Sequence, residues 1–195
     1  MTCVVKIGGS LCDDPRLSVW LDMFVELGAG KVVIVPGGGP YADVVHIQQK
    51  RWKFSDEIAH ALAVRAMDQF ALQLTGINTR LVLAAKFTEL NNAMSKSDVA
   101  VWLPSEIVLA APDIAPTWDV TSDSLAAWLA RKLNAGRLIL VKSCPVPADS
   151  NLETLSQLGV LDQGFLSMAP AANCSIDVLS ITDLDRVRKI LIQIS

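Results

Sequence analysis

The sequence lacks an excess of charge of either sign. Its 17 Lys and Arg residues stand against 20 Asp and Glu residues, for a formal net charge of −3. A chain so close to neutral offers no electrostatic footprint for polyanions, so we expect neither nucleic acid nor an anionic membrane as a partner. Only 19% of the residues are charged while 51% are hydrophobic, which argues against a disordered chain.

Long apolar runs and clustered cysteines are also missing. No stretch approaches the ~20 apolar residues of a membrane span, and the first residues lack the basic and apolar regions of a secretion signal. The cysteines form no C-x-x-C pair and have no histidine partner at zinc-ligand spacing, which predicts neither disulfides nor a structural metal. We therefore expect a cytoplasmic protein. The four cysteines are Cys3, Cys12, Cys144 and Cys174.

Apolar residues, in contrast, are abundant for a chain of 195 residues. A single domain of this length can bury roughly 70% of the surface of its unfolded chain without a disulfide or a metal. The mean hydropathy of +0.39 predicts a large packed core, with a homo-oligomer interface as the alternative use of the apolar surface. No repeat or linker divides the sequence, so we expect one domain over residues 1–195.

Short β-branched runs alternate with stretches of helical period, the pattern of an α/β domain with a mostly parallel sheet. The expected strands cover residues 4–7, 31–35, 80–84, 99–103, 137–141, 175–181 and 190–194. The expected helices cover residues 17 to 28 or 30, 41–49, 55–74, 121–133 and 184–187. Gly76 and Gly136 are the expected stop signals of the third and fourth helix.

Two glycine clusters follow the first two expected strands directly and precede helical segments. They consist of Gly8 and Gly9, and of Gly37, Gly38 and Gly39. Backbone N–H groups at such turns form anion cradles, and glycine lets the main chain approach an oxygen closely. Because Lys6 lies beside the first cluster in an otherwise apolar strand, the pattern predicts a phosphate site.

Two common phosphate motifs fit this pattern poorly. The Walker A pattern fails, because Lys31 after Gly30 is followed by Val32. Residues 37–42 match the dinucleotide fingerprint G-x-G-x-x-[GA], with Asp56 or Glu57 as the ribose acid. However, these acids look like the start of a helix, and this match leaves the first glycine cluster unexplained. A nicotinamide-dependent oxidoreductase is therefore an alternative that rests on one motif.

A third constellation accounts for both clusters. Residues 4–11 (VVKIGGSL) and 33–40 (VIVPGGGP) resemble the K-x-G-G-S and P/H-G-G-G turns of the amino acid kinase superfamily. Residues 120–127 (VTSDSLAA), followed by the strand at 137–141, resemble that superfamily's N-A-D-x-x-A helix start. The three motifs occur in the family's order. The resemblance implies a three-layer αβα sandwich of the amino acid kinase or carbamate kinase type.

The resemblance also implies an ATP-dependent phosphotransferase that uses Mg²⁺. By motif match, Lys6 would be catalytic, and Asp123 would orient it; Asp123 as a plain first-turn acid is the alternative. The implied nucleotide and phosphate contacts are Gly8, Gly9, Ser10, Gly37, Gly38 and Gly39. Many members supply a second catalytic lysine late in the chain, and no such segment is present. Lys142 either replaces it or is a solvated strand-end lysine. No protein ligands for a metal are predicted, because Mg²⁺ on ATP keeps several waters.

Within the superfamily, the short chain and the pattern of residues 37–43 and 59–67 most resemble archaeal and methylotroph members that phosphorylate (5-aminomethylfuran-3-yl)methyl phosphate. The resemblance implies a small anionic acceptor, with another phosphate or a carboxylate acceptor, or a nucleotide-binding protein with reduced activity, as alternatives. Trp52 is expected near the substrate, and the other four tryptophans in the core or an interface. The candidate acceptor residues are Pro40, Arg51, Trp52, Lys53, His60 and Arg65.

Overall fold

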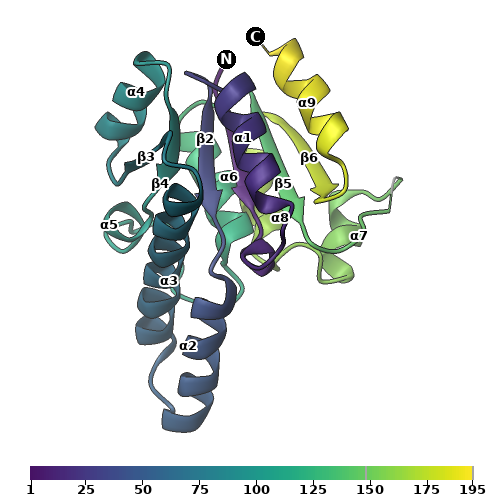
Figure 1. Cartoon of the computed structure of the whole chain (residues 1–195). Coiled ribbons are helices and arrows are strands. Elements are labelled where there is room, and N and C mark those ends of the chain that lie inside the picture. The colour runs from purple at the N-terminus through teal and green to yellow at the C-terminus, as the bar shows by residue number, and fades with distance from the viewer. Residues whose placement is uncertain (148, 195) are drawn as a thin grey trace.

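The computed structural model describes residues 1–147 and 149–194. Within them, six parallel strands form one sheet in the order β3-β4-β2-β1-β5-β6 (Figure 1). The strands are β1 (Cys3–Ile7), β2 (Val32–Pro36), β3 (Leu81–Ala84), β4 (Val99–Trp102), β5 (Arg137–Lys142) and β6 (Ser175–Ser180). The central strands are buried on both faces, which explains their nearly continuous apolar sequence. The predicted α/β class with a parallel sheet is confirmed.

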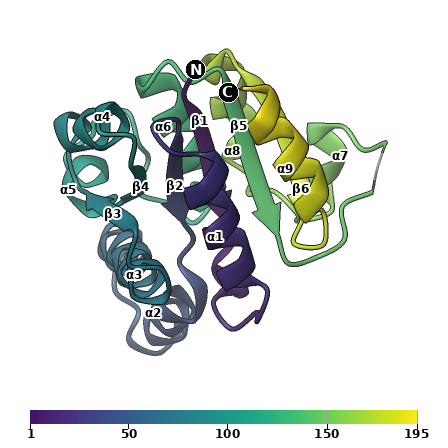
Figure 2. The same ribbon diagram turned by 45° about the horizontal axis from the view of Figure 1, so that its top comes forward.

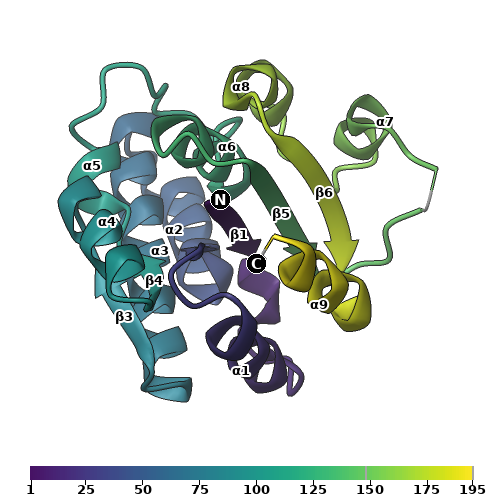
Figure 3. The same ribbon diagram turned by 90° about the horizontal axis from the view of Figure 1, so that it is seen from above.

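Helices cover both faces of this sheet and make the three layers that the sequence predicts. Helices α6 (Ser122–Lys132) and α8 (Phe165–Ala172) lie on one face, and α1 (Leu17–Leu27) and α9 (Leu184–Gln193) lie on the other (Figures 2 and 3). The remaining helical segments are the 3₁₀ turn η1 (Gly9–Leu11), α2 (Gly39–Trp52), α3 (Asp56–Ile77), α4 (Phe87–Ser95), α5 (Ser105–Val108) and α7 (Leu152–Gln157). In the described part of the chain no helix is both long and apolar enough to cross a membrane.

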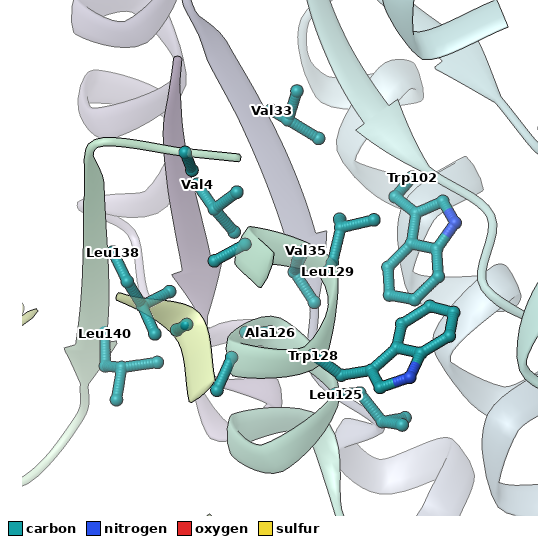
Figure 4. Packing of buried hydrophobic residues seen from close by; sticks show 14 of the residues in the cluster. Val4, Val33, Val35, Trp102, Leu125, Ala126, Trp128, Leu129, Leu138 and Leu140 are labelled. Atoms are coloured by element: carbon teal, nitrogen blue, oxygen red, sulfur yellow. The ribbon is translucent and has the colours of Figure 1, made fainter. Parts of the chain in front are cut away.

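The alternation of side chains along the strands divides the core into two clusters. In β1, Val4 faces the α6 side, whereas Val5 faces the α1 side. The α6 side includes Trp102 and Trp128, whose rings stack with centroids 6.3 Å apart (Figure 4). This contact packs α6 against β4 on this face of the sheet. Helix α6 is thereby held firmly against the strands whose ends carry the glycine turns.

Helices α2 and α3 form a hairpin that projects beyond the carboxyl edge of the sheet (Figure 1). Helix α2 begins at this edge, at the last residue of the second glycine cluster, and ends at the outer tip of the hairpin. Ser55 caps the return helix α3 by accepting a hydrogen bond from the Ile58 amide at 3.4 Å. The second half of α3 then packs its apolar face, including Phe70 and Leu74, against the sheet.

Several predicted boundaries are wrong. Helix α3 continues through Gly76 to Ile77; a Cβ at Gly76 would meet no atom within 4 Å, so the glycine serves neither packing nor termination there. Helix α6 ends at Lys132, and Asn134 rather than Gly136 has the left-handed φ of 48°. Residues 190–194, predicted as a strand, belong almost entirely to α9. Their apolar side chains at helical spacing cover the sheet instead of extending it.

Candidate active site

The carboxyl ends of β1, β2 and β5 meet at one edge of the sheet, and β1 lies between the other two. The chain passes from β1 to β2 on one side and later returns to β5 on the other side. Open α/β sheets bind ligands at such a switch point, outside the carboxyl ends of the strands. Both glycine clusters and both candidate catalytic lysines lie at this edge.

The two glycine turns are packed directly against one another. A Cβ at Gly9 would lie 2.0 Å from the Gly39 backbone nitrogen, and a Cβ at Gly37 would lie 2.2 Å from the Gly9 nitrogen. Gly39 itself has a φ of +56°, which favours glycine. The clusters therefore need glycine first of all so that their main chains can touch. Gly38 is the N-cap of α2, so the second turn also presents the free N–H groups of a helix N-terminus.

Hydrogen bonds fasten the first turn to β5. The Gly8 amide donates to the Val141 carbonyl at 2.9 Å. The hydroxyl oxygens of Ser10 and Ser143 are 2.8 Å apart and share a hydrogen bond. Ser143 was not predicted as a site residue, because nothing in the local sequence indicates that β5 lies next to β1. These bonds hold the Gly8–Ser10 turn against the end of the strand that carries Lys142.

Lys6, Lys142 and Asp123 form a buried ion cluster behind the glycine turns. Side chains on a strand alternate between its faces, so Lys6 points to the same face as Val4, and Lys142 to the same face as Leu140. Both lysines therefore reach Asp123 in the first turn of α6. The Lys6 Nζ lies 2.9 Å from Asp123 Oδ1, and the Lys142 Nζ lies 2.5 Å from Asp123 Oδ2. The side chains are between 5% and 11% exposed, so neither lysine is a solvated strand-end residue.

The electrostatics of this cluster leave a positive charge at the sheet edge. Burial opposes ionisation of Asp123, but the charges of Lys6 and Lys142 outweigh burial and lower the pKa of the carboxyl. Burial, together with the charge of Lys6, lowers the pKa of Lys142 to about 8, against the attraction of Asp123. Lys6, Lys142 and Asp123 alone sum to one positive charge, which the nearby carboxylate of Asp162 opposes. Asp123 is locked between the lysines and is poorly suited to accept a proton from a substrate.

Asp162 completes the surroundings of Asp123 and was not predicted. Its backbone N–H donates to Asp123 Oδ2 at 3.3 Å, and its carboxylate accepts hydrogen bonds from the start of α6. Asp162 lies in the loop between α7 and α8, about 40 residues from its partners in sequence. No motif surrounds it, so only the folded chain reveals this contact.

A cleft of about 390 Å³ opens beside the glycine turns, between η1, the start of α2, α3 and the segment that leads into α6. Its lining includes Gly9, Ser10, Gly38, Gly39, Pro40, Val64, Met67, Trp118, Thr121 and Ser122. Cys12, Asp13, Asp43 and His60 contribute the titratable side chains. Lys6, Asp123 and Lys142 are not among its lining residues, although Ser122, the neighbour of Asp123 in sequence, is.

His60 lines this cleft from α3 and is 9% exposed. Its burial lowers the pKa of the imidazole, which favours the neutral ring. Within residues 1–147 and 149–194, no hydrogen-bond partner is seen for its ring. His60 can therefore offer a hydrogen bond to a bound molecule.

Four of the predicted acceptor residues are not brought to this cleft. Helix α2 has 14 residues and is about 20 Å long, so its C-terminal residues lie far from the glycine turn at its start. There, the Arg51 guanidinium stacks 5.1 Å from the ring centre of the exposed Trp52, and Lys53 ends the helix in a left-handed conformation. Arg65 lines a separate hollow on the far side of His60. Pro40 and His60, in contrast, lie in the cleft lining.

Trp118, rather than Trp52, lies beside the cleft. It lines the cleft, its indole N–H donates to Gln49 Oε1 at 2.7 Å, and its ring meets His46 edge-on with centroids 5.0 Å apart. Trp118 is only partly buried, so it does not belong to the core; its alternative placement in an interface stays a prediction. Its position two residues before the Val120–Ser122 segment of the third motif was the available signal.

A larger hollow of about 600 Å³ lies at the amino ends of β5 and β6, beside α7 and α8. Glu153 is the charged residue of its lining. Because it contains neither a glycine turn nor a cluster of ionisable groups, it offers little for catalysis. In the described chain, no three His, Cys, Asp or Glu side chains cluster so that they could hold a metal.

The sequence of residues 1–146 matches the amino acid kinase family. The chain therefore belongs to this family, in agreement with its motifs and its sheet.

Among its relatives is the [5-(aminomethyl)furan-3-yl]methyl phosphate kinase of Methanocaldococcus jannaschii. It is 33% identical over 138 residues, which are 70% of this chain and 63% of that protein. The match thus spans less than two thirds of the length of that relative.

Solved structures of the same fold cover almost the whole chain. Uridylate kinase from Archaeoglobus fulgidus has a TM-score of 0.72 at 16% identity, and the match covers 98% of this chain and 95% of that one. The product complex of isopentenyl phosphate kinase from T. acidophilum has a TM-score of 0.62 at 14% identity, with 97% and 95% covered. At such low identity these structures establish the fold alone.

Proposed function

We propose that this protein is an ATP-dependent kinase that transfers the γ-phosphoryl group of ATP to the phosphate of a small phosphomonoester. The observation that carries this proposal is the buried Lys6–Asp123–Lys142 cluster at the carboxyl edge of the sheet. Phosphoryl transfer spreads negative charge over the oxygens of the moving group, so catalysis consists mainly of positioning and charge stabilisation. Two lysines on one carboxylate supply such a charge.

In the proposed reaction, an oxygen of the acceptor phosphate forms a bond to the γ-phosphorus. The bond from that phosphorus to the bridging oxygen breaks, and its electron pair leaves with ADP. Lys6 and Lys142 stabilise the charge that develops on the transferred oxygens. The products are ADP and a diphosphate of the acceptor.

The state of Asp123 favours an acceptor that is already ionised. An alcohol would need a general base to remove its proton, and Asp123 is held as a carboxylate between two ammonium groups. A phosphomonoester with a second pKa near 6 is largely a dianion at neutral pH. It can attack without a base, as a carboxylate acceptor also can.

ATP would lie with its phosphates on the N–H groups of the Gly8–Ser10 turn, and the acceptor phosphate on the turn of Gly37, Gly38 and Gly39. Mg²⁺ bound to the nucleotide would neutralise phosphate charge and keep several waters. That arrangement needs no dedicated cage of protein carboxylates.

The name of the Methanocaldococcus relative suggests the acceptor. In [5-(aminomethyl)furan-3-yl]methyl phosphate, the aminomethyl group is a cation at neutral pH, and the furan ring is flat and mostly apolar. In the cleft, Met67 and Trp118 offer apolar surface for such a ring, while Asp13 and Asp43 offer carboxylates for the ammonium group. We therefore favour an aminomethylfuran methyl phosphate over an isoprenoid phosphate, which has no cationic group.

An acceptor panel tests this proposal through ADP release. We expect turnover with (5-aminomethylfuran-3-yl)methyl phosphate, and weaker turnover with the same molecule without its amine, with isopentenyl phosphate, with UMP and with aspartate. Asp43→Asn should raise KM for the amine acceptor and leave KM for the amine-free one unchanged. Glu26→Gln on the exposed end of α1 is the matched control. ATP binding by calorimetry without turnover on any acceptor would instead indicate a nucleotide-binding protein.

The dinucleotide reading has little support in the geometry. Asp56 begins α3 at the outer tip of the hairpin and accepts a hydrogen bond from Gln49 Nε2 at 2.7 Å, far from the glycine turns.

We also propose a reducing, cytoplasmic location, which the four free thiols support. Association with a second copy of the chain stays a prediction that light scattering would test.

A further inference from the structure

We propose that Asp162 is a positioning residue of this site: it fixes the start of α6 and thereby holds Asp123 between the two lysines. Its catalytic consequence rests on the proposed function, whereas its effect on the lysines does not. Asp162 comes from the segment after residue 146, beyond the part of the chain that matches the family.

The carboxylate of Asp162 acts as the N-terminal cap of a helix that belongs to another part of the chain. One oxygen, Oδ2, accepts from the Thr121 amide at 3.0 Å, from the Thr121 hydroxyl at 2.7 Å and from the Ser124 amide at 3.0 Å. The other oxygen, Oδ1, accepts from the Ser124 hydroxyl. Thr121, at the N-cap position of α6, makes no side-chain cap bond of its own. Asp162 therefore satisfies N–H groups that would otherwise remain without a protein acceptor.

Asp162 also contacts the residue that pairs with the lysines. Its backbone N–H donates to Asp123 Oδ2, the same oxygen that lies 2.5 Å from the Lys142 Nζ. Asp123 is in the first turn of α6, between the two residues whose backbone N–H groups Asp162 binds. A rotation of this first turn would move the carboxylate away from Lys6 or from Lys142. The contacts on either side of Asp123 oppose that rotation.

A second contact fixes the loop that carries Asp162. The Gly164 amide donates to the Asp119 carbonyl at 2.7 Å. A Cβ at Gly164 would lie 2.7 Å from the same carbonyl oxygen and 2.9 Å from the Ser124 hydroxyl. The loop between α7 and α8 is thus packed closely onto the start of α6, and the loop and the helix start form one unit.

Charge gives Asp162 a second effect. The groups that face Lys142 are Lys6 from β1, Asp123 from α6 and Asp162 from the loop. The negative charge of Asp162 raises the pKa of Lys142 and so opposes the effects of burial and of Lys6. Loss of this charge should release the Lys142 proton at lower pH, and a neutral Lys142 cannot stabilise a transferred phosphoryl group.

The test compares Asp162→Asn, Asp162→Ala and the control Asn151→Ala. Asparagine can still cap a helix, since its amide oxygen accepts hydrogen bonds, but it carries no charge. Asn151 caps the neighbouring α7 through a 2.8 Å bond from the Thr154 amide, so its side-chain hydrogen bond does not involve α6. All three proteins would be measured for melting temperature, for kcat and KM with Mg·ATP and the acceptor, and for the pH dependence of kcat/KM.

For Asp162→Asn we expect a melting temperature close to wild type, a kcat three- to tenfold lower, and a basic limb shifted to lower pH. For Asp162→Ala we expect a further loss of kcat of tenfold or more, with KM for ATP changed less than twofold. Asn151→Ala should lower the melting temperature and leave kcat and the pH profile unchanged. A wild-type pH profile and kcat in Asp162→Asn, or a loss of kcat in Asn151→Ala equal to that in Asp162→Ala, would overturn the proposal.

A measurement that needs no kinase activity separates this proposal from the proposed function. The rate at which acetic anhydride modifies Lys142, followed by mass spectrometry across pH, reports the neutral fraction of its amine. Modification should begin at lower pH in Asp162→Asn than in wild type, and not in Asn151→Ala. An unchanged profile in Asp162→Asn would contradict the role of Asp162 even if the protein proves to be a kinase. A shifted profile without turnover would refute the proposed function alone.

Discussion

Replacement of Asp123 by asparagine removes the carboxylate that lies between Lys6 and Lys142, whereas Lys6→Met removes one of its two cationic partners. The structure predicts that Asp123→Asn lowers the stability strongly, whereas Lys6→Met lowers the activity strongly and the stability little. In Asp123→Asn, two ammonium groups remain buried without their counter-charge. In Lys6→Met, Asp123 keeps its ion pair with Lys142 and its hydrogen bond from the Asp162 amide.

The magnitudes follow from these partners. Removal of one partner from a buried ion pair typically costs about 3–5 kcal/mol of unfolding free energy, and we expect this range for Asp123→Asn near pH 7. For Lys6→Met we expect a loss of roughly 1 kcal/mol or less, because no buried charge is left unpaired and the repulsion between the lysines disappears. Its kcat should nevertheless fall ~10²–10³-fold, as is typical when a donor that stabilises transition-state charge is removed.

Urea unfolding at pH 7 and at pH 9 provides the assay. In Asp123→Asn, loss of the carboxylate's attraction should lower the pKa of Lys142 further below its value of about 8. The folded protein then releases this proton at a pH where the unfolded chain still holds it. Stability relative to wild type should therefore recover between pH 7 and pH 9. Two results would show that Asp123 is not the counter-charge of two buried lysines. One is a Lys6→Met protein as unstable as Asp123→Asn, and the other is an Asp123→Asn protein with wild-type stability.

Three further predictions concern pH, packing and the cleft. Because the pKa of Lys142 is about 8, kcat/KM should fall as the pH rises through this value. The same deprotonation favours the folded state, so unfolding does not cause this fall in kcat/KM. Lys142→Arg should move the basic limb of the pH profile to higher pH. Gly9→Ala should destabilise the protein by about 1–3 kcal/mol and abolish activity, since its Cβ would lie 2.0 Å from the Gly39 nitrogen; Gly76→Ala is the stability control. Trp118→Ala should raise the acceptor KM at least tenfold while Trp52→Ala leaves it unchanged; equal effects would contradict the placement of the cleft.

Much of the fold could be predicted from local sequence signals. The buried parallel strands have apolar, β-branched sequences, and the glycine turns interrupt two of them directly. Ser55 was predicted as the start of α3, and its side chain does cap that helix. The errors occur where local signals compete with packing. The apolar residues of 190–194 fit a strand by composition, but in α9 they cover the sheet.

The candidate site was predictable only to the extent that local sequence motifs describe it. Lys6, Asp123 and the glycines belong to local motifs, and the structure brings them to one edge of the sheet. Arg51 and Lys53 are candidate acceptor residues by sequence, but the length of helix α2 separates them from the glycine turn by about 20 Å. Asp162 and Trp118 reach the site through long-range contacts, and of the two only Trp118 lies beside a local motif.

The central claim is that the cationic edge of the sheet transfers a phosphoryl group from ATP to a phosphate. Phosphorus NMR of a reaction with Mg·ATP and (5-aminomethylfuran-3-yl)methyl phosphate tests it most directly, with Lys6→Met as the inactive control. We expect the acceptor signal to be replaced by a pair of coupled diphosphate signals while ADP forms in equal amount. Lys6→Met should slow this reaction at least a hundredfold, as ~2.7 kcal/mol of lost stabilisation implies. Formation of ADP and inorganic phosphate with the acceptor unchanged, or diphosphate formation at an equal rate in Lys6→Met, would contradict it.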